Sequence, residues 1–325
     1  MSNSMYTSEE VLRDAAATAL LAPSIFNTQP WRWEVRDSAL ELRTDRSRQL
    51  AVTDPMGRML TISCGLALHH ALVALAAEGR RASVERLPDE SDRGLLARIT
   101  LAGVTEPADV RLRDAISRRH TDRRPFAETA VPDDVIDRLR TGAEARGVYL
   151  AELHADSLVR FQVTAARAGE LDADDPAYQA ELAEWTHRPA DTRDGVTPAT
   201  AVAPTPRKVP LRSFFPAGAE GLLPGPGHDG GARYLVLWTT DDTPADWLAA
   251  GEAMSAVLLE TTASGLAASP MTDVVEVPAS RALLHRLLDN LGNAQAALRI
   301  GVPATDEAAP PTPRRAAGDV IDTDR

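Results

Sequence analysis

The pattern of apolar and polar positions predicts a chain in which helices and short strands are interspersed from end to end. Apolar residues recur at helical spacing over residues 8–21, 107–119, 132–146, 156–169, 175–185 and 278–290. Alternating or short apolar runs predict strands over residues 31–36, 39–44, 82–87, 95–101, 148–154, 233–239 and 296–302. Thr7 and Glu10 form a capping-box pattern at the start of the first helix. The first two strands, separated only by Asp37 and Ser38, form a predicted β-hairpin.

Two longer helices, over residues 56–77 and 245–263, are apolar on nearly every side, which is typical of central core helices. They also resemble each other. Alignment at a constant offset of 186 matches small and apolar residues, among them Gly65 with Gly251, Ala67 with Ala253, Leu72 with Leu258 and Gly79 with Gly265. Small residues at helical spacing predict two helices that cross closely, as two pseudo-equivalent halves would require. Chance agreement between two Ala-rich helices is the alternative.

Residues 186–230 are rich in Pro, Gly, Thr and Ala and have few apolar runs. A connection of this length is either disordered or a functional lid. The apolar pieces at residues 209–215 and at Leu222 and Leu223 favour a lid that packs on the rest of the protein.

A short loop after the first helix presents the polar side chains of Ser24, Asn27 and Gln29 between two prolines and just before Trp31. Proline fixes its own φ and restricts the residue before it, so these side chains have little freedom left to lose on binding. We therefore predict a binding loop. The alternative is a stiff connection whose amides cap the preceding helix.

Length and charge narrow the function classes. With 325 residues the chain can form one large or two medium domains. Its formal charge of −12 opposes non-specific electrostatic binding to nucleic acid or to an anionic membrane. It has no basic-then-apolar signal and no apolar run near the roughly 18 residues of a membrane span, which predicts a cytoplasmic protein. The single cysteine, Cys64, excludes an internal disulfide, and no metal site is predicted.

One dense basic cluster stands out against this acidic background. Its members fall within seven residues: Arg118, Arg119, His120, Thr121, Arg123 and Arg124. Forked guanidinium donors beside a hydroxyl are suited to a phosphate group. The alternative is a solvated charge run that complements the C-terminal dipole of the preceding helix.

The loop sequence around Asn27 resembles the APSxxNxQPW segment of the FMN-dependent nitroreductase family, and the basic cluster resembles that family's RRSxRxF segment. In ordinary family members both segments occur in one short subunit. Here they are split between the two parts of the chain, which resembles the fused, actinobacterial Acg-type branch. The resemblance implies an α+β, nitroreductase-like fold in which two pseudo-equivalent halves, residues 1–105 and 106–325, mimic the nitroreductase dimer and share one FMN.

The same resemblance implies a set of FMN-binding residues from four segments. They are Ser24, Asn27 and Gln29; Arg119, His120, Thr121 and Arg123; Ser269, Pro270 and Met271; and Arg314 and Arg315. A plain turn is the alternative for residues 269–271, and a solvated terminus is the alternative for Arg314 and Arg315. No catalytic side chain is assigned, because the flavin ring performs the hydride chemistry.

The implied function is an FMN-dependent oxidoreductase that takes a hydride from NAD(P)H and passes it to a small electrophilic acceptor. An alternative is a catalytically silent protein that stores FMN under the lid, residues 186–230. A third is an interaction protein without a cofactor. The fused halves imply a monomer that is itself a pseudo-dimer, or a weak homodimer.

Overall fold

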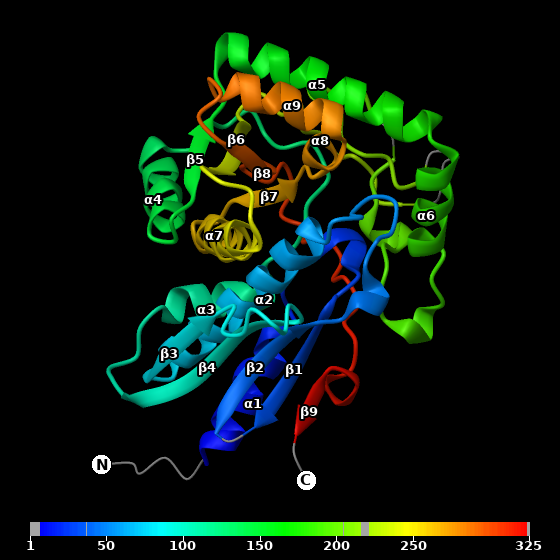
Figure 1. Ribbon diagram of the computed structural model, residues 1–325. Coiled ribbons are helices and arrows are strands. Elements are labelled where there is room, and N and C mark those ends of the chain that lie inside the picture. The colour runs from blue at the N-terminus through cyan, green and yellow to red at the C-terminus, as the bar shows by residue number, and fades with distance from the viewer. Residues whose placement is uncertain (1–6, 37, 204, 216–220, 324–325) are drawn as a thin grey trace.

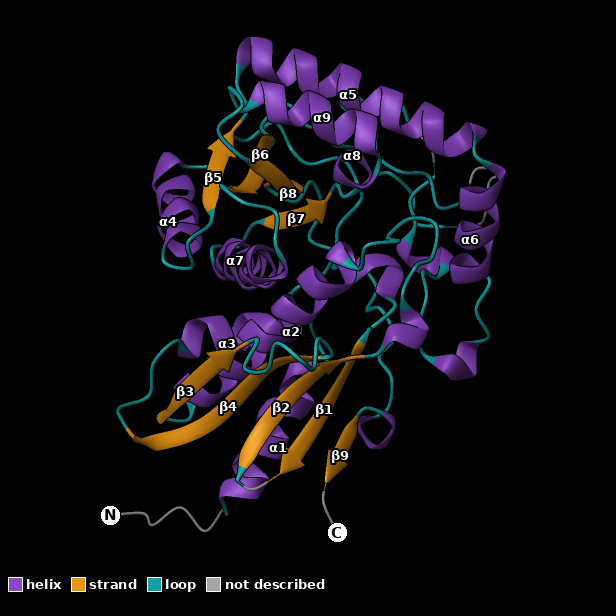
Figure 2. Ribbon diagram, in the orientation of Figure 1, coloured by secondary structure: helices purple, strands orange, loops and turns teal. Residues whose placement is uncertain are grey.

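The computed structural model describes residues 7–36, 38–203, 205–215 and 221–323. It is a mixed α+β structure with two separate sheets, which confirms the predicted α+β class (Figures 1 and 2). The first sheet has the order β3-β4-β2-β1-β9, and the second has the order β5-β6-β8-β7. The strands of the first sheet are β1 (Trp31–Arg36), β2 (Ala39–Thr44), β3 (Arg80–Arg86), β4 (Leu95–Val104) and β9 (Ile321–Thr323). Those of the second are β5 (Tyr149–Glu152), β6 (Arg233–Thr239), β7 (Ala267–Pro270) and β8 (Asn293–Gly301).

Two long helices, α2 (Arg58–Ala77) and α7 (Pro244–Ala263), lie between the sheets and pack against each other (Figure 1). They cross at the two glycines that the sequence alignment matches. A Cβ added at Gly65 would lie 2.9 Å from the Cα of Gly251, and one added at Gly251 would lie 2.1 Å from the carbonyl oxygen of Ile62. The prediction of a close crossing is therefore confirmed, because no larger residue fits at either position without separating the helices.

The long apolar helix α2 corrects one expectation. By length and composition it could cross a membrane, although the sequence analysis expected no apolar run of that kind. In the structure 89% of its most apolar stretch is buried inside the protein. It is apolar on all sides because α1, α3, α7 and strands of the first sheet surround it.

The remaining helices cover the outer faces. The helices α1 (Ser8–Ala19) and α3 (Val110–Arg118) pack on α2, and α4 (Asp133–Glu144) packs on α7. A layer of α5 (Ala155–Asp174), α8 (Asp273–Glu276) and α9 (Pro278–Leu287) lies over the second sheet, and α6 (Pro176–Thr186) contacts α5 (Figure 2). The Thr7 and Glu10 capping box is present at α1, and the β1–β2 hairpin has its predicted bounds.

Among the described α-helices and strands, β7, α8 and β9 lie outside the predicted set. The most consequential is β9, which pairs in parallel with β1, so that Ile321 lies opposite Trp33. The C-terminal end of the chain, counted within residues 106–325, thus joins the sheet formed by the N-terminal part (Figure 1). The residues just before β9 also contact the loop at Asn27. The Asn27 amide nitrogen donates a hydrogen bond to the carbonyl of Pro313, and the Arg315 backbone amide donates one to the Gln29 side chain.

The segment over residues 186–230 is packed on the protein in its described parts; residues 204 and 216–220 lie outside the described residues. It contains two short 3-10 helices, Ala190–Thr192 and Pro198–Thr200, and a bridge between Val202 and Leu222. Val209 is 1% exposed. The carboxylate of Asp194 pairs with Arg48 and Arg188, which ties the segment to the first part of the chain.

Candidate functional site

The polar loop before β1 has an unusual backbone. Phe26, Asn27 and Gln29 have φ values of 45°, 54° and 49°, in the left-handed region that residues with a side chain rarely adopt. The hydroxyl of Ser24 accepts a hydrogen bond from the Gln29 amide at 2.9 Å and fixes the turn. Backbone strain of this kind persists where the surrounding structure over-determines it, and it clusters at binding sites.

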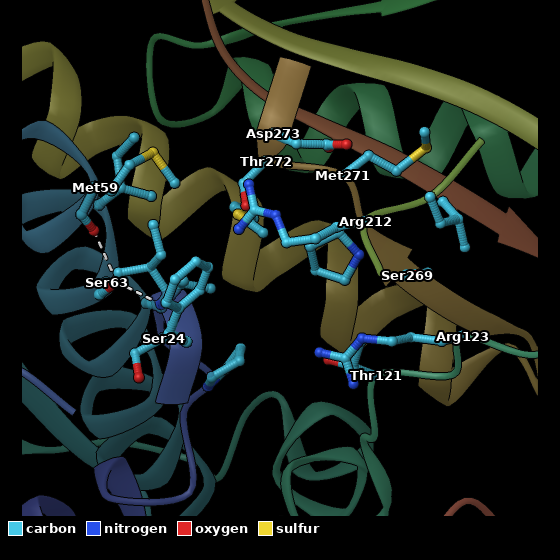
Figure 3. Close-up of a pocket in the computed structure, with 18 of the residues that line it drawn as sticks. Ser24, Met59, Ser63, Thr121, Arg123, Arg212, Ser269, Met271, Thr272 and Asp273 are labelled. Atoms are coloured by element: carbon cyan, nitrogen blue, oxygen red, sulfur yellow. Dashed lines mark hydrogen bonds between the residues drawn. The ribbon is translucent and has the colours of Figure 1, made fainter. Parts of the chain in front are cut away.

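A cavity opens between this loop, α2, β7 and residues 211–214, and it holds about 730 Å³ when the open space at its mouth is counted (Figure 3). Its walls are mainly apolar, and its lining includes Phe26, Met59, Ile62, Leu66, Phe214, Met254 and Met271. Polar side chains reach it from several elements: Ser24, Ser63, Thr121, Arg123, Arg212, Ser269, Thr272 and Asp273. We call it the apolar cavity.

A smaller, polar cavity adjoins the first. Both are lined by Pro23, Ser24, Phe26, Thr121 and Arg123, so they lie side by side. The residues that line only the smaller one are Asn27, Arg119, Val196, Thr200, Thr312 and Arg314. We call it the polar cavity.

The polar cavity is lined by two arginines, the buried Arg119 and the half-buried Arg314. Arg119 is 6% exposed, and its Nε and Nη1 atoms have no hydrogen-bond partner; Nε of Arg314 has none either. Within the described residues neither guanidinium makes an ion pair with a carboxylate. Burial, with a contribution from the charge of Arg314, lowers the pKa of Arg119 to about 9, and burial lowers the pKa of Arg314 to about 10. Both remain cationic at neutral pH, so the cavity lacks a compensating negative charge.

The basic cluster divides its side chains between two sides of an extended segment. Thr121 forms a parallel bridge with Ala268, and the Asp122 amide donates to the carbonyl of Ala268 at 2.9 Å. Side chains of an extended chain alternate, so Arg119, Thr121 and Arg123 line the site. His120 and Asp122 between them, and Arg118 and Arg124 on either side, line a separate surface groove beside the end of α7.

His120 therefore lies outside both cavities, although the family resemblance placed it with the cofactor-binding residues. Its imidazole lines the separate groove and is half-buried. Burial and the nearby charges of Arg119 and Arg314 lower the pKa of His120. The charges of Arg119 and Arg314 therefore act on His120, although its ring lies on the other side of the segment.

Gln29 and Arg315 also lie outside the two cavities. The Gln29 side chain, 1% exposed, donates to the carbonyl of Arg193 at 2.9 Å and accepts from the Arg315 amide at 2.9 Å. The Arg315 guanidinium donates to the Gln29 carbonyl at 3.3 Å and lies 3.7 Å from Asp45. These two residues bind the C-terminal segment to the loop, and Arg314 next to them faces the polar cavity.

Ser269, Pro270 and Met271 all line the apolar cavity. The alternative of a plain turn is wrong, because residues 267–270 form β7, an edge strand paired with β8. The Met271 amide continues this pairing by donating to the carbonyl of Ala297 at 2.8 Å. The strand holds this stretch of backbone against the cavity.

Arg212 and Phe214 line the apolar cavity and were not predicted. The Arg212 guanidinium lies 4.8 Å from the ring centre of Phe26 and 5.8 Å from that of Phe214, and it pairs with Glu276. Figure 3 shows Arg212 and Arg123 in the cavity from different parts of the chain. The signal for these residues was the apolar run at residues 209–215, which indicated packing but not the place of packing.

The chain is similar over nearly its whole length to two proteins of Mycobacterium tuberculosis strain H37Rv. It is 39% identical over 328 residues to "Putative NAD(P)H nitroreductase Rv3131", covering 98% of this chain and 93% of that protein. It is 38% identical over 330 residues to "Putative NAD(P)H nitroreductase acg", covering 99% and 98%. The chain therefore belongs to the nitroreductase family. Its relatives in that family are the Acg-like proteins, which confirms the resemblance drawn from the two motifs.

No protein-family model matches the chain. Two solved structures with low sequence identity are also similar. The FMN and NADPH-dependent nitroreductase NfnB of a Sphigopyxis strain is 17% identical with a TM-score of 0.41, covering 65% of this chain and 97% of that one. A nitroreductase with bound FMN from Bacteroides fragilis is 12% identical with a TM-score of 0.37, covering 60% and 90%.

Proposed function

We propose that the protein binds FMN in the two adjoining cavities and passes a hydride from NAD(P)H, through the flavin, to a small electrophilic acceptor. One observation supports the proposal most strongly. The polar cavity holds the buried Arg119 and the half-buried Arg314, both with unpartnered guanidinium atoms and with no carboxylate among its described lining residues, and it adjoins a larger apolar cavity. A ligand with an anionic end and a flat apolar end fits this arrangement.

The residues present fit FMN part by part. Arg119 and Arg314 would hold the phosphate through their unpartnered guanidinium atoms, and the Thr121 hydroxyl is available where the two cavities meet. Ser24 lies on the opposite wall of the same junction and reaches both cavities. When bound, FMN supplies the hydride chemistry, and the protein supplies position and electrostatics.

The apolar cavity would receive the ring system. Its apolar walls exclude water, and β7 presents the backbone of Ser269 and Pro270 along one side. The Arg123 guanidinium adds a positive charge, and its Nη1 atom donates to the carbonyl of Thr200 at 2.9 Å, which fixes its direction. A fixed cation beside the ring stabilises the negative charge that develops there on reduction.

The proposal includes the fused-dimer interpretation, with halves at residues 1–105 and 106–325. Ser24 and Asn27 from the first part of the chain and Arg119 and Thr121 from the second line the same polar cavity. The crossing of α2 and α7 at matched glycines supports two related halves. A chain of this kind would bind one FMN as a monomer or a weak homodimer. The names of its full-length relatives support NAD(P)H as the electron donor.

A second candidate function is FMN storage without turnover. It is favoured by Leu211, Arg212 and Phe214 of the predicted lid, which line the apolar cavity. A nicotinamide must stack on the flavin face to transfer a hydride, so a lid that stays in this position would exclude it.

The visible spectrum of the FMN-loaded protein before and after anaerobic addition of NAD(P)H separates the candidates. Bleaching of the flavin bands is the result expected of a reductase. A protein that binds FMN but stays yellow with either nucleotide would support storage and contradict the reductase proposal. A protein that cannot be loaded with FMN would overturn both.

A further inference from the structure

A third cavity lies under residues 201–214 and holds about 800 Å³ with its open space counted. All its described lining residues except Arg123 belong to the predicted lid, so we call it the lid cavity. It shares Arg123, Leu211, Arg212 and Phe214 with the apolar cavity. The two cavities are therefore neighbours, with these four side chains at their shared boundary.

The charged residues that line the lid cavity are all arginines. They are Arg123, Arg207 and Arg212, and no carboxylate is found among the described residues of the lining. Arg212 pairs with Glu276, and Arg207 shares the carboxylate of Asp229 with another arginine, whereas Arg123 makes no ion pair among the described residues. In a chain with a net charge of −12, a cavity lined by three cations and no anion is a local exception.

The charge of Arg207 is only partly compensated. Its side chain is 7% exposed, and its Nη1 atom has no hydrogen-bond partner. That atom lies 3.7 Å from Asp229, a carboxylate that also pairs with Arg299 and accepts from the Phe126 amide. The Asp229 carboxylate is thus shared between the guanidinium groups of Arg207 and Arg299. Burial, and then the charge of Arg299, lowers the pKa of Arg207 to about 10.

Arg123 is linked to Arg207, and its own charge is uncompensated. The Arg207 Nη2 atom donates to the Arg123 carbonyl at 2.5 Å, which holds the two residues side by side. The Arg123 guanidinium donates to Thr200 and lies 4.7 Å from the ring centre of Phe214, but it makes no ion pair among the described residues. Burial and repulsion by Arg212 lower its pKa to about 10.

We infer that the lid cavity binds the anionic group of the electron acceptor, and that this acceptor is a small electrophile carrying a carboxylate. Forked guanidinium groups bind carboxylates through paired, charge-assisted hydrogen bonds. The carboxylate lies between Arg207 and Arg123, and the electrophilic part of the same molecule reaches past Phe214 into the apolar cavity. The inference rests on the proposed function, because it names the substrate class of the same site.

The test uses benzoate and benzamide, which have nearly the same shape and differ in charge. Each is titrated by calorimetry into the full-length protein, with FMN loaded and without it, so the reading does not depend on turnover. We expect the parent to bind benzoate about tenfold or more tightly than benzamide, as a charge-assisted pair provides. In Arg207→Gln, which keeps a donor for the Arg123 carbonyl but removes the charge, the preference should fall to about twofold or less. Arg207→Lys should keep part of it.

Equal binding of the two probes by the parent, or an unchanged preference in Arg207→Gln, would overturn the inference. FMN loading serves as the folding control, because Arg207 lines neither the apolar nor the polar cavity. Failure to load FMN would count against the proposed function, and the charge preference would still be read on the flavin-free protein. ADP-ribose is titrated in parallel. If it competes with benzoate and loses affinity in Arg207→Gln, the cavity binds the donor's phosphates and the assignment to the acceptor is wrong.

Discussion

The side-chain oxygen of Asn27 accepts a hydrogen bond from Nη1 of Arg314 at 3.2 Å, which joins the first loop of the chain to its C-terminal segment. The Asn27 amide nitrogen donates to the carbonyls of Gly195 and Pro313 at 3.1 Å each. Three distant segments therefore meet at one amide. Asn27 lines the polar cavity, but these bonds make it a residue that positions Arg314.

We predict that Arg314→Ala weakens FMN binding roughly ten- to hundredfold, because it removes one of two cations that face the phosphate. The matched control is Arg315→Ala, which deletes a neighbouring guanidinium that lines neither cavity. Fluorescence titration of FMN measures both. Similar affinities for the two variants would show that the phosphate lies elsewhere.

The alternation of side chains along residues 119–124 gives a second prediction. Thr121→Val removes a hydroxyl that lines both cavities and should weaken FMN binding by about 0.5–1.5 kcal/mol, the usual net worth of one hydrogen bond. His120→Ala should leave the FMN affinity unchanged, because its ring faces the other groove. A larger loss in His120→Ala than in Thr121→Val would reverse the assignment.

The crossing of α2 and α7 predicts a large cost for a very small substitution. A Cβ at Gly251 would meet the Ile62 carbonyl oxygen at 2.1 Å, so Gly251→Ala must push the helices apart. Overpacking of this kind costs about 1–3 kcal/mol of unfolding free energy. Gly169→Ala in α5 is the control, because nothing lies within 4 Å of its Cβ position and alanine favours a helix. Thermal unfolding should show a lower midpoint only for Gly251→Ala.

The sequence predicted those features of the structure that depend on residues close together in the chain. The β1–β2 hairpin follows from alternation around a two-residue turn, and the loop at Ser24 follows from its prolines. The helix crossing was also predictable, because the matched glycines Gly65 and Gly251 leave a groove only where another backbone must approach.

The unpredicted features depend on contacts between distant segments. No local pattern indicates that β9 pairs with β1, or that the Gln29 amide binds the backbone of Arg315. The direction in which His120 faces depends on the bridge between Thr121 and Ala268, which lie 147 residues apart along the sequence (268 − 121 = 147). The family resemblance indicated residues near the site. It could not distinguish residues that line the cavities, such as Arg119, from residues that hold the surrounding segments together, such as Gln29.

The predicted lid allows a fourth test. Replacing residues 190–228 with a short Gly-Ser linker removes Leu211, Arg212 and Phe214 from the apolar cavity and Val196 and Thr200 from the polar cavity. It keeps Arg119 and Thr121 in the chain. We expect the parent already to be reduced by NAD(P)H, and the deletion to lose selectivity among acceptors. Stopped-flow bleaching that is fast in the deletion and absent in the parent would instead identify the lid as a block and the protein as a store. Retention of FMN by the deletion is the control.

The central claim is that one FMN phosphate binds the buried guanidinium of Arg119. The measurement that tests it most directly is a calorimetric titration of FMN into the parent, Arg119→Ala and Arg118→Ala, the last being an exposed neighbour that lines only the outer groove. The account predicts one FMN per chain and a loss of about 1.5–3 kcal/mol, or one to two decades in affinity, in Arg119→Ala alone. Unchanged affinity in a folded Arg119→Ala protein would contradict it.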